Sequence, residues 1–212
     1  MIKRILQLGL VLLVAAVMPA KATSYTNPYV MMQEVADKAF GRLAQERGEL
    51  EQDPAKVRAL IDEELLPYID YKYAAYKVMG QQARSATKEQ RLAFTEQFKE
   101  YMLATFANAF NKYNDQTLEF APEQPYGDAK IVAINVKLIE ERREPVDLQF
   151  KARKNKKGHW KVFDLVAEGI SLLASQQAEL GGLIRQNGIE SVTAQLAERN
   201  RQGIVATTGQ SQ

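Results

Sequence analysis

Residues 131–167 read IVAINVKLIEERREPVDLQFKARKNKKGHWKVFDLVA, and this stretch decides the fold class. Between Val146 and Arg153, apolar and polar side chains alternate without a break, which is typical of a strand with one covered and one wet face. Residues 131–138 alternate in the same way, whereas residues 160–167 are apolar on both faces, as in a fully covered strand. The stretch therefore predicts three strands in succession.

The links between these strands are short, and short links join antiparallel neighbours. They cover residues 140–145 and 154–158. A shorter candidate strand, Thr117–Ala121, precedes them. The sequence therefore predicts a four-stranded antiparallel curved sheet.

Helical periodicity dominates on both sides of this region. Apolar residues recur at i+4 spacing from Met31 to Leu43, and Asn27-Pro28, Asp53-Pro54 and Thr87 are helix-start signals. We predict helices over residues 28–47, 54–67, 69–79, 87–113, 171–186 and 189–199. The expected class is α+β, with a helical N-terminal half, the sheet, two C-terminal helices and an apolar pocket between sheet and helices.

The helix expected over residues 87–113 is the longest. Its apolar side chains cover an arc of roughly 200°, against about 100° for an ordinary surface helix. They are Phe94, Phe98, Tyr101, Met102, Phe106, Ala109, Phe110 and Tyr113. Such a helix must be covered on two sides or must line an apolar space.

The first 22 residues have the pattern of a secretory signal peptide. Lys3 and Arg4 precede the apolar run Ile5–Met18, and Ala20 and Ala22 form an A-x-A cleavage pattern. The alternative is an uncleaved anchor, but the run is shorter than the about 20 residues that a span needs. We expect a signal peptide over 1–22, one domain over 23–200 and a disordered tail over 201–212.

Composition narrows the classes of function. Residues 1–22 hold three of the 28 basic residues and none of the 26 acidic ones, so the remainder carries a charge of about −1. This balance does not favour nucleic-acid binding. With no cysteine and one histidine, a disulfide, a zinc site or a cysteine nucleophile is not expected.

Few residues suggest catalysis. His159, the only histidine, follows a charged turn and is expected to be exposed. Asp164 and Glu168 lie among apolar residues, where a carboxylate can act as a general base with a raised pKa. The alternative for both residues is a hydrogen bond to backbone at the strand-to-helix turn, and we favour it because no second polar catalytic group is visible.

Two further groups have both a functional and a structural interpretation. The tyrosines Tyr68, Tyr71, Tyr73 and Tyr76 suit either a pocket mouth or core packing. A basic hairpin tip, expected near Arg142 and Arg143, suits either an anionic partner or plain solvation. Its members are Lys151, Arg153, Lys154, Lys156 and Lys157.

Several motifs resemble the MlaC (toluene-tolerance) family, in order and over nearly the whole chain after the signal peptide. The most specific is Trp160–Leu165 followed by Glu168–Ser171, which is similar to the family pattern W-x-x-Y-D-hydrophobic then E-G-V-S. The others are Asn27–Tyr29, Glu64–Tyr68, Met79–Gln81, Ser85–Arg91 and Ala121–Pro125. Phe163 and Ile170 replace Tyr and Val, and Ala174–Gln176 stands where many members have Asn-Tyr-Arg.

The resemblance implies a monomeric, non-enzymatic periplasmic shuttle with phospholipid as cargo and no cofactor or metal. Its partners would be an outer-membrane lipoprotein-porin complex and an inner-membrane ABC-transporter complex. The process served would be maintenance of outer-membrane lipid asymmetry. Arg91, Arg142 and Arg143 are the candidate docking residues, because we expect them to be exposed charges.

An acyl-chain carrier must enclose apolar surface, because exposing each CH₂ to water costs about 0.8 kcal/mol. The long helix and the inner face of the sheet supply suitable side chains. Our candidates for lipid contact are Phe98, Met102, Phe106, Val132, Ile134, Val136, Leu148, Phe150, Val162, Leu165, Ile170 and Leu172.

Two other classes of function remain open at this point. One is a cone-shaped periplasmic enzyme that uses Asp164 or Glu168 in the cavity. The other is a periplasmic chaperone for unfolded outer-membrane proteins, which would copurify with peptide rather than with lipid.

Overall fold

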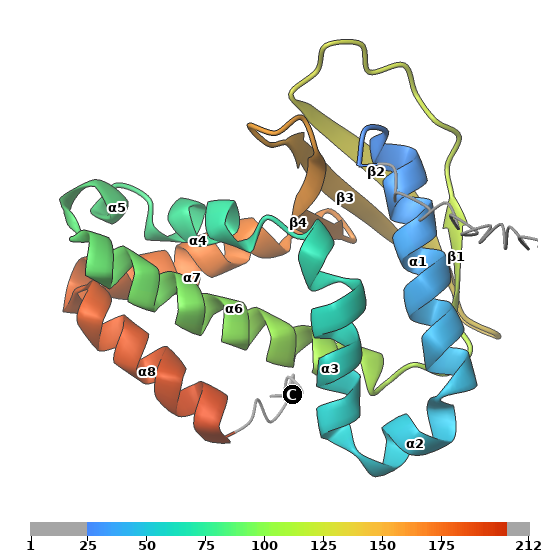
Figure 1. Cartoon of the computed structure of the whole chain (residues 1–212), viewed down its shortest axis with the longest axis horizontal. Coiled ribbons are helices and arrows are strands. Elements are labelled where there is room, and N and C mark those ends of the chain that lie inside the picture. The colour runs from blue at the N-terminus through green and yellow to red at the C-terminus, as the bar shows by residue number, and fades with distance from the viewer. Residues whose placement is uncertain (1–24, 203–212) are drawn as a thin grey trace, which may run out of the picture.

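A computed structural model describes residues 25–202, which form an α+β fold (Figure 1). An antiparallel sheet with α1 beside it makes up one side of the molecule, and α4 to α8 make up the other. The helices before the sheet are α1 (Pro28–Gln45), α2 (Arg47–Gln52), α3 (Pro54–Glu64), the 3₁₀ turn η1 (Leu66–Tyr68), α4 (Tyr71–Met79), α5 (Gln82–Ser85) and α6 (Lys88–Phe110). Two helices follow it, α7 (Leu172–Asn187) and α8 (Ile189–Gln202). The predicted fold class is confirmed.

The helix starts follow the sequence signals. Asn27 caps α1, its side-chain oxygen accepting hydrogen bonds from the amides of Tyr29 and Val30 at 2.8 and 3.2 Å. Thr87 and Gln90 form a complete capping box at the start of α6. These caps satisfy amides that have no partner within the helix.

The sheet is fully antiparallel, with the strand order β1-β2-β3-β4-β5. Four strands match the predicted ones: β1 (Thr117–Phe120), β2 (Ile131–Ile139), β3 (Val146–Lys154) and β4 (Trp160–Ala167). The fifth, β5 (Ile170–Ser171), is an addition to the predicted four. It returns from β4 through Glu168 and Gly169, which have φ values of 49° and 78°. Two successive positive φ values are those of the type I′ turn that suits tight hairpins.

Three features of the prediction need correction. The short helices α2 and α5 were missed, and the helix starting at Pro54 ends at Glu64, before η1. The helix predicted over residues 189–199 is longer, because α8 extends to Gln202. The signal peptide and residues 203–212 lie outside the described residues. Within residues 25–202, no helix combines the length and the apolar character that a membrane crossing requires.

Three hydrophobic clusters hold the fold together. The first joins α4, α6, α7 and α8 around Phe94 and Leu180. The second joins α1 to the sheet around Trp160 and Ile134. The third joins α1, α2, α3 and α6 around Leu60. Because α6 contributes to the first and third clusters, its wide apolar arc is covered on more than one side, as predicted.

Candidate functional site

One face of the sheet, here called the inner face, is apolar across four strands. The strand register places Val136, Leu148, Ala167 and Ile170 side by side in one row from β2 to β5. A second row joins Ile134, Phe150 and Leu165, and a third joins Val132, Ala152 and Val162. Ala167 is absent from the sequence-based set, although the pairing of β3 with β4 places it in the first row.

Coverage of the inner face falls steadily along the first row. Val136 on β2 is only 2% exposed, because α1 packs there through Met31, Met32 and Val35. Leu148 on β3 and Ala167 on β4 are half-buried. Ile170 on β5 is 62% exposed. The protein therefore leaves the β3–β5 half of an apolar face incompletely covered, which is unusual for a water-facing surface.

The predicted lipid-contacting residues fall into two groups. Phe98, Val132, Ile134 and Val136 are buried in the protein's own clusters. The other eight keep some exposure: Met102, Phe106, Leu148, Phe150, Val162 and Leu165 are half-buried, and Ile170 and Leu172 are exposed. Phe106 packs in the third cluster, away from the sheet-bound members. The structure thus unites the strand residues but does not bring all twelve together.

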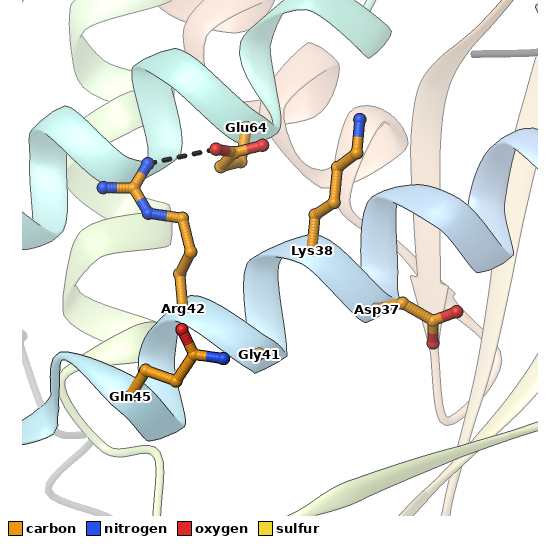
Figure 2. Close-up of a pocket in the computed structure, with 6 residues that line it drawn as sticks. All are labelled: Asp37, Lys38, Gly41, Arg42, Gln45 and Glu64. Carbon is orange, nitrogen blue, oxygen red and sulfur yellow. Dashed lines mark hydrogen bonds and ion pairs between the residues drawn. The ribbon is translucent and has the colours of Figure 1, made fainter. Parts of the chain in front are cut away.

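A hollow of about 430 Å³ lies elsewhere, between α1 and α3 (Figure 2). Lys38 and Arg42 of α1 rise beside it, and Glu64 of α3 lies opposite. Asp37, Gly41 and Gln45 complete the lining. This lining is polar, so the hollow does not match the apolar pocket predicted between sheet and helices.

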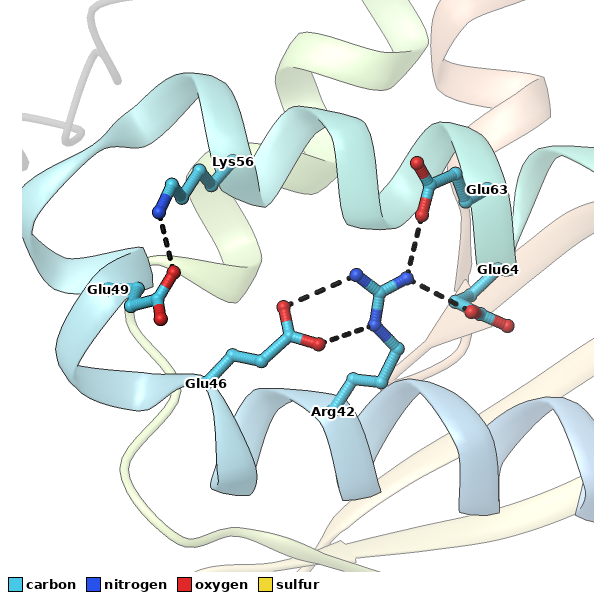
Figure 3. Close-up of polar contacts among 6 residues, drawn as sticks. All are labelled: Arg42, Glu46, Glu49, Lys56, Glu63 and Glu64. Carbon is cyan, nitrogen blue, oxygen red and sulfur yellow. Dashed lines mark hydrogen bonds and ion pairs between the residues drawn. The ribbon is translucent and has the colours of Figure 1, made fainter.

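Arg42 is the centre of a polar network that joins α1 to α3 (Figure 3). Its guanidinium donates to Glu46 at 2.7 Å, to Glu63 at 2.8 Å and to Glu64 at 3.0 Å. The hydrogen bond from Arg42 lowers the pKa of Glu46, and the three carboxylates raise the pKa of Arg42. The network holds two helices together, so its groups already have partners within the protein.

A second hollow, of about 310 Å³, lies where α4 ends against α5 and α7. It is lined by Val78–Gln82, Gln177 and Arg185. It belongs to the helical side of the molecule and does not touch the inner face of the sheet.

The two candidate catalytic carboxylates accept hydrogen bonds from backbone amides. Asp164 is 7% exposed and accepts hydrogen bonds from the amide of Leu173 at 3.0 Å and the hydroxyl of Ser171 at 2.8 Å. Glu168 accepts one from the amide of Asp147 at 2.9 Å. The structural alternative given for Asp164 is therefore confirmed.

His159 is exposed, as predicted, and its ring stacks on Tyr25 with centroids 5.1 Å apart. The tyrosine group divides. Tyr68 is buried and also stacks on Tyr25, with centroids 5.2 Å apart, Tyr73 packs edge-on against Phe163, and Tyr76 is exposed. Core packing therefore accounts for Tyr68, and the four do not gather at one pocket mouth.

The basic hairpin needs a correction. Lys151 pairs with Asp164 at 3.2 Å and Arg153 with Asp70 at 2.6 Å. Lys156 and Lys157 follow the end of β3, whereas Arg142 and Arg143 precede its start. Nine strand residues span about 30 Å, so the two basic turns lie at opposite ends of the sheet.

The three candidate docking arginines also differ. Arg142 and Arg143 are exposed, with side-chain exposures of 88% and 73%. Arg91 is half-buried and donates to the carbonyl oxygens of Ala83 and Ala86. The premise that Arg91 is an exposed charge is wrong, because its guanidinium ties α5 to α6. Among residues 25–202, no group of three or more potential metal ligands occurs.

A solved protein of similar fold contains a bound phospholipid. The structure superposes with a TM-score of 0.72 on the phospholipid-binding protein of Ralstonia solanacearum, solved in complex with a phospholipid. The two are 26% identical, and the match covers 82% of this chain and 97% of the other.

The sequence comparisons agree. The model of the family described as MlaC protein matches residues 33–198. The chain is 33% identical over 195 residues to the intermembrane phospholipid transport system binding protein MlaC of Haemophilus influenzae, with 91% of both chains covered. It is 24% identical over 185 residues to the toluene tolerance protein ttg2D of Pseudomonas putida, covering 87% of this chain and 85% of the relative. The chain belongs to the MlaC family.

Proposed function

We propose that this protein binds a phospholipid and carries it between membranes. The observation that carries the proposal is the half-open apolar inner face, whose exposure rises from β2 to β5. Acyl chains laid on this face would complete its coverage and would themselves leave water. The resemblance in fold to a protein solved with phospholipid supports the same ligand class.

The lipid-contacting set follows from the exposure of each side chain. Leu148, Phe150, Leu165, Ala167 and Ile170 lie on the part of the inner face that is incompletely covered. Met102, Phe106 and Leu172 keep apolar surface on the helices. Phe98, Val132, Ile134 and Val136 support these residues from within the protein's own clusters.

The biological setting is part of the proposal. The relative from Haemophilus influenzae is named for intermembrane phospholipid transport. A carrier with this role would work in the periplasm, after removal of residues 1–22. It would exchange lipid with an outer-membrane lipoprotein-porin complex and an inner-membrane ABC-transporter complex, and so maintain outer-membrane lipid asymmetry. The exposed Arg142 and Arg143 at the β2–β3 turn are the docking candidates. Arg91 is not among them, because it is half-buried and its Nη1 donates to the carbonyl oxygens of Ala83 and Ala86.

We propose no catalytic role. Asp164 is occupied by its contacts with Lys151, Ser171 and Leu173, and Glu168 holds the amide of Asp147. These contacts account for both carboxylates as structural groups of the β4–β5 turn and the start of α7.

Native and denaturing mass spectrometry of protein purified from periplasm tests the function. A native excess mass that denaturation releases as phospholipid is the expected result. Ile170→Asp should reduce the fraction of protein with bound lipid. Leu92→Asp is the control and should leave this fraction unchanged, because Leu92 is a similarly exposed apolar residue but lies on α6 and not on the inner face of the sheet. Peptide in place of lipid would support the chaperone alternative, and a protein that takes no lipid from vesicles would overturn the proposal.

A further inference from the structure

Asp164, 7% exposed, is the one buried charged residue among the described residues. It lies on the outer face of β4, opposite Lys151 of β3, while its neighbour Leu165 lies on the inner face opposite Phe150. Its carboxylate therefore points away from the surface that we propose for lipid. A buried carboxylate is costly unless it is paired and hydrogen-bonded, so its partners indicate what it does.

Apart from Lys151 of β3, Asp164 accepts hydrogen bonds from Ser171, which ends β5 and caps α7, and from Leu173 at the start of α7. One oxygen accepts the amide hydrogen of Leu173 at 3.0 Å. The other accepts the hydroxyl hydrogen of Ser171 at 2.8 Å and the ammonium of Lys151 at 3.2 Å. Ser171 in turn accepts from the amide of Ala174 at 3.0 Å. A negative charge here also interacts favourably with the positive end of the helix.

This anchor holds the segment that bears the exposed apolar side chains. Ile170, which ends the first row of the inner face, directly precedes Ser171. Leu172, 40% exposed, lies between the two residues that Asp164 holds. We infer that Asp164, together with Ser171 and Lys151, is a positioning group for lipid binding. It fixes the β5–α7 edge of the apolar surface from the opposite face of the sheet, and this role rests on the proposed function.

A second anchor of the same chemistry provides a matched control. Asp70 caps α4 by accepting the amide hydrogen of Tyr73 at 3.2 Å, and it pairs with Arg153 at 2.6 Å. It adjoins the opposite end of β4, where Ile69 bridges Val162. Asp70 therefore ties a helix to the same sheet without holding Ile170 or Leu172.

The test loads the full mature chain with a pyrene-labelled phosphatidylglycerol and follows its release to unlabelled vesicles. Asp164→Asn and Ser171→Ala should release lipid about three- to tenfold faster, the range that corresponds to a lost helix cap. Ser171→Ala removes only one hydroxyl, so it keeps the test valid if Asp164→Asn folds poorly. Asp70→Asn should release lipid at the parent rate.

Hydrogen exchange on the same samples separates positioning from simple capping. Faster exchange of the 173–175 amides with faster lipid release supports the positioning role. Faster exchange with unchanged release overturns it, as does equal acceleration by Asp70→Asn. A parent chain that takes up no phospholipid overturns the proposed function, and the positioning role with it. A parent that binds, with variants that release at its rate, overturns the positioning role alone.

Discussion

Trp160 joins the start of β4 to the N-terminal segment. It is completely buried, and its indole Nε1 donates to the carbonyl oxygen of Thr26 at 3.1 Å. Its backbone amide donates to the carbonyl of Tyr25 at 2.8 Å. Trp160 thus belongs to the sheet-side cluster and also holds the segment that precedes α1 against the start of β4.

Replacing Trp160 by Phe should lower the free energy of unfolding by about 2 kcal/mol, because it removes one hydrogen bond and leaves part of the indole volume empty. Urea denaturation followed by circular dichroism measures this change. Trp160→Phe keeps the backbone hydrogen bond to Tyr25, so the fold should be retained. The slope of free energy against urea concentration should then stay the same, because the surface exposed on unfolding hardly changes. A loss below about 0.5 kcal/mol, the level of an ordinary surface substitution, would contradict the role assigned to this side chain.

Glu46 gives a pH-dependent contribution of defined sign. The hydrogen bond from Arg42 lowers its pKa below the ordinary 4.5. A carboxyl whose pKa is lower in the folded state stabilises the protein fully above its unfolded pKa, and loses this effect as the pH falls through the folded value. Glu46→Gln should therefore have a lower Tm than the parent at about pH 7, and this difference should be smaller at about pH 3. Thermal unfolding at both pH values tests this, and a pH-independent difference would exclude the ionic contribution.

At the scale of elements, α4 and α7 pack closely where Gly181 faces Val78. A Cβ at Gly181 would lie 2.8 Å from the carbonyl oxygen of Val78, a distance that real Cβ atoms essentially never show. At the adjacent Gly182 the nearest atom is the Nη2 of Arg185, 3.7 Å away at the end of a flexible side chain. Two successive glycines of one helix therefore stand in opposite environments.

Alanine substitution should separate them. Gly181→Ala should destabilise the protein by about 1–3 kcal/mol, because the backbone of α4 must move away. Gly182→Ala should stabilise it by up to about 1 kcal/mol through helix propensity alone. Chemical denaturation of the two variants compares the values directly. Equal effects of the same sign would show that the α4–α7 contact is not tight.

The sequence predicted the elements in proportion to the length and clarity of their patterns. Thr87 with Gln90 and Asn27 with Pro28 are local signals, and both gave correct helix starts. The elements that were missed have six residues in α2, four in α5 and two in β5, too few for a period to show. Their formation depends on tertiary contacts, such as Arg91 holding Ala83 and Ala86.

The sequence predicted which residues form the inner face, but not which of them are exposed. The alternation along β2 and β3 correctly gave the residues of the inner face, because period 2 fixes the side of each residue. It did not show that α1 covers Ile134 and Val136 while Ile170 stays open. That difference depends on where a distant helix packs, and a local pattern does not carry this information.

At the scale of the whole molecule, the two sides shown in Figure 1 are joined by few elements. α6 belongs to the helical cluster through Phe98 and to the third cluster through Leu103. Leu65 packs against both the sheet-side and the third cluster. On the outer face, the pair of Asp70 with Arg153 and the hydrogen bond from the Leu173 amide of α7 to Asp164 of β4 add two polar connections. We therefore expect these contacts to hold the fold together even when nothing is bound to the incompletely covered part of the inner face.

Removal of the lipid should accordingly weaken the protein without unfolding it. A ligand that binds only the native state stabilises it by about 2.7 kcal/mol at a concentration one hundred times its Kd. The delipidated protein should have a lower Tm, and hydrogen exchange should rise around Leu148, Leu165 and Ile170 but not around Phe94 and Leu180. Detergent extraction followed by refilling from phosphatidylglycerol vesicles measures both changes and their reversal. An unchanged Tm, or protection lost mainly in the α4–α8 cluster, would place the lipid elsewhere than on the β3–β5 half of the inner face.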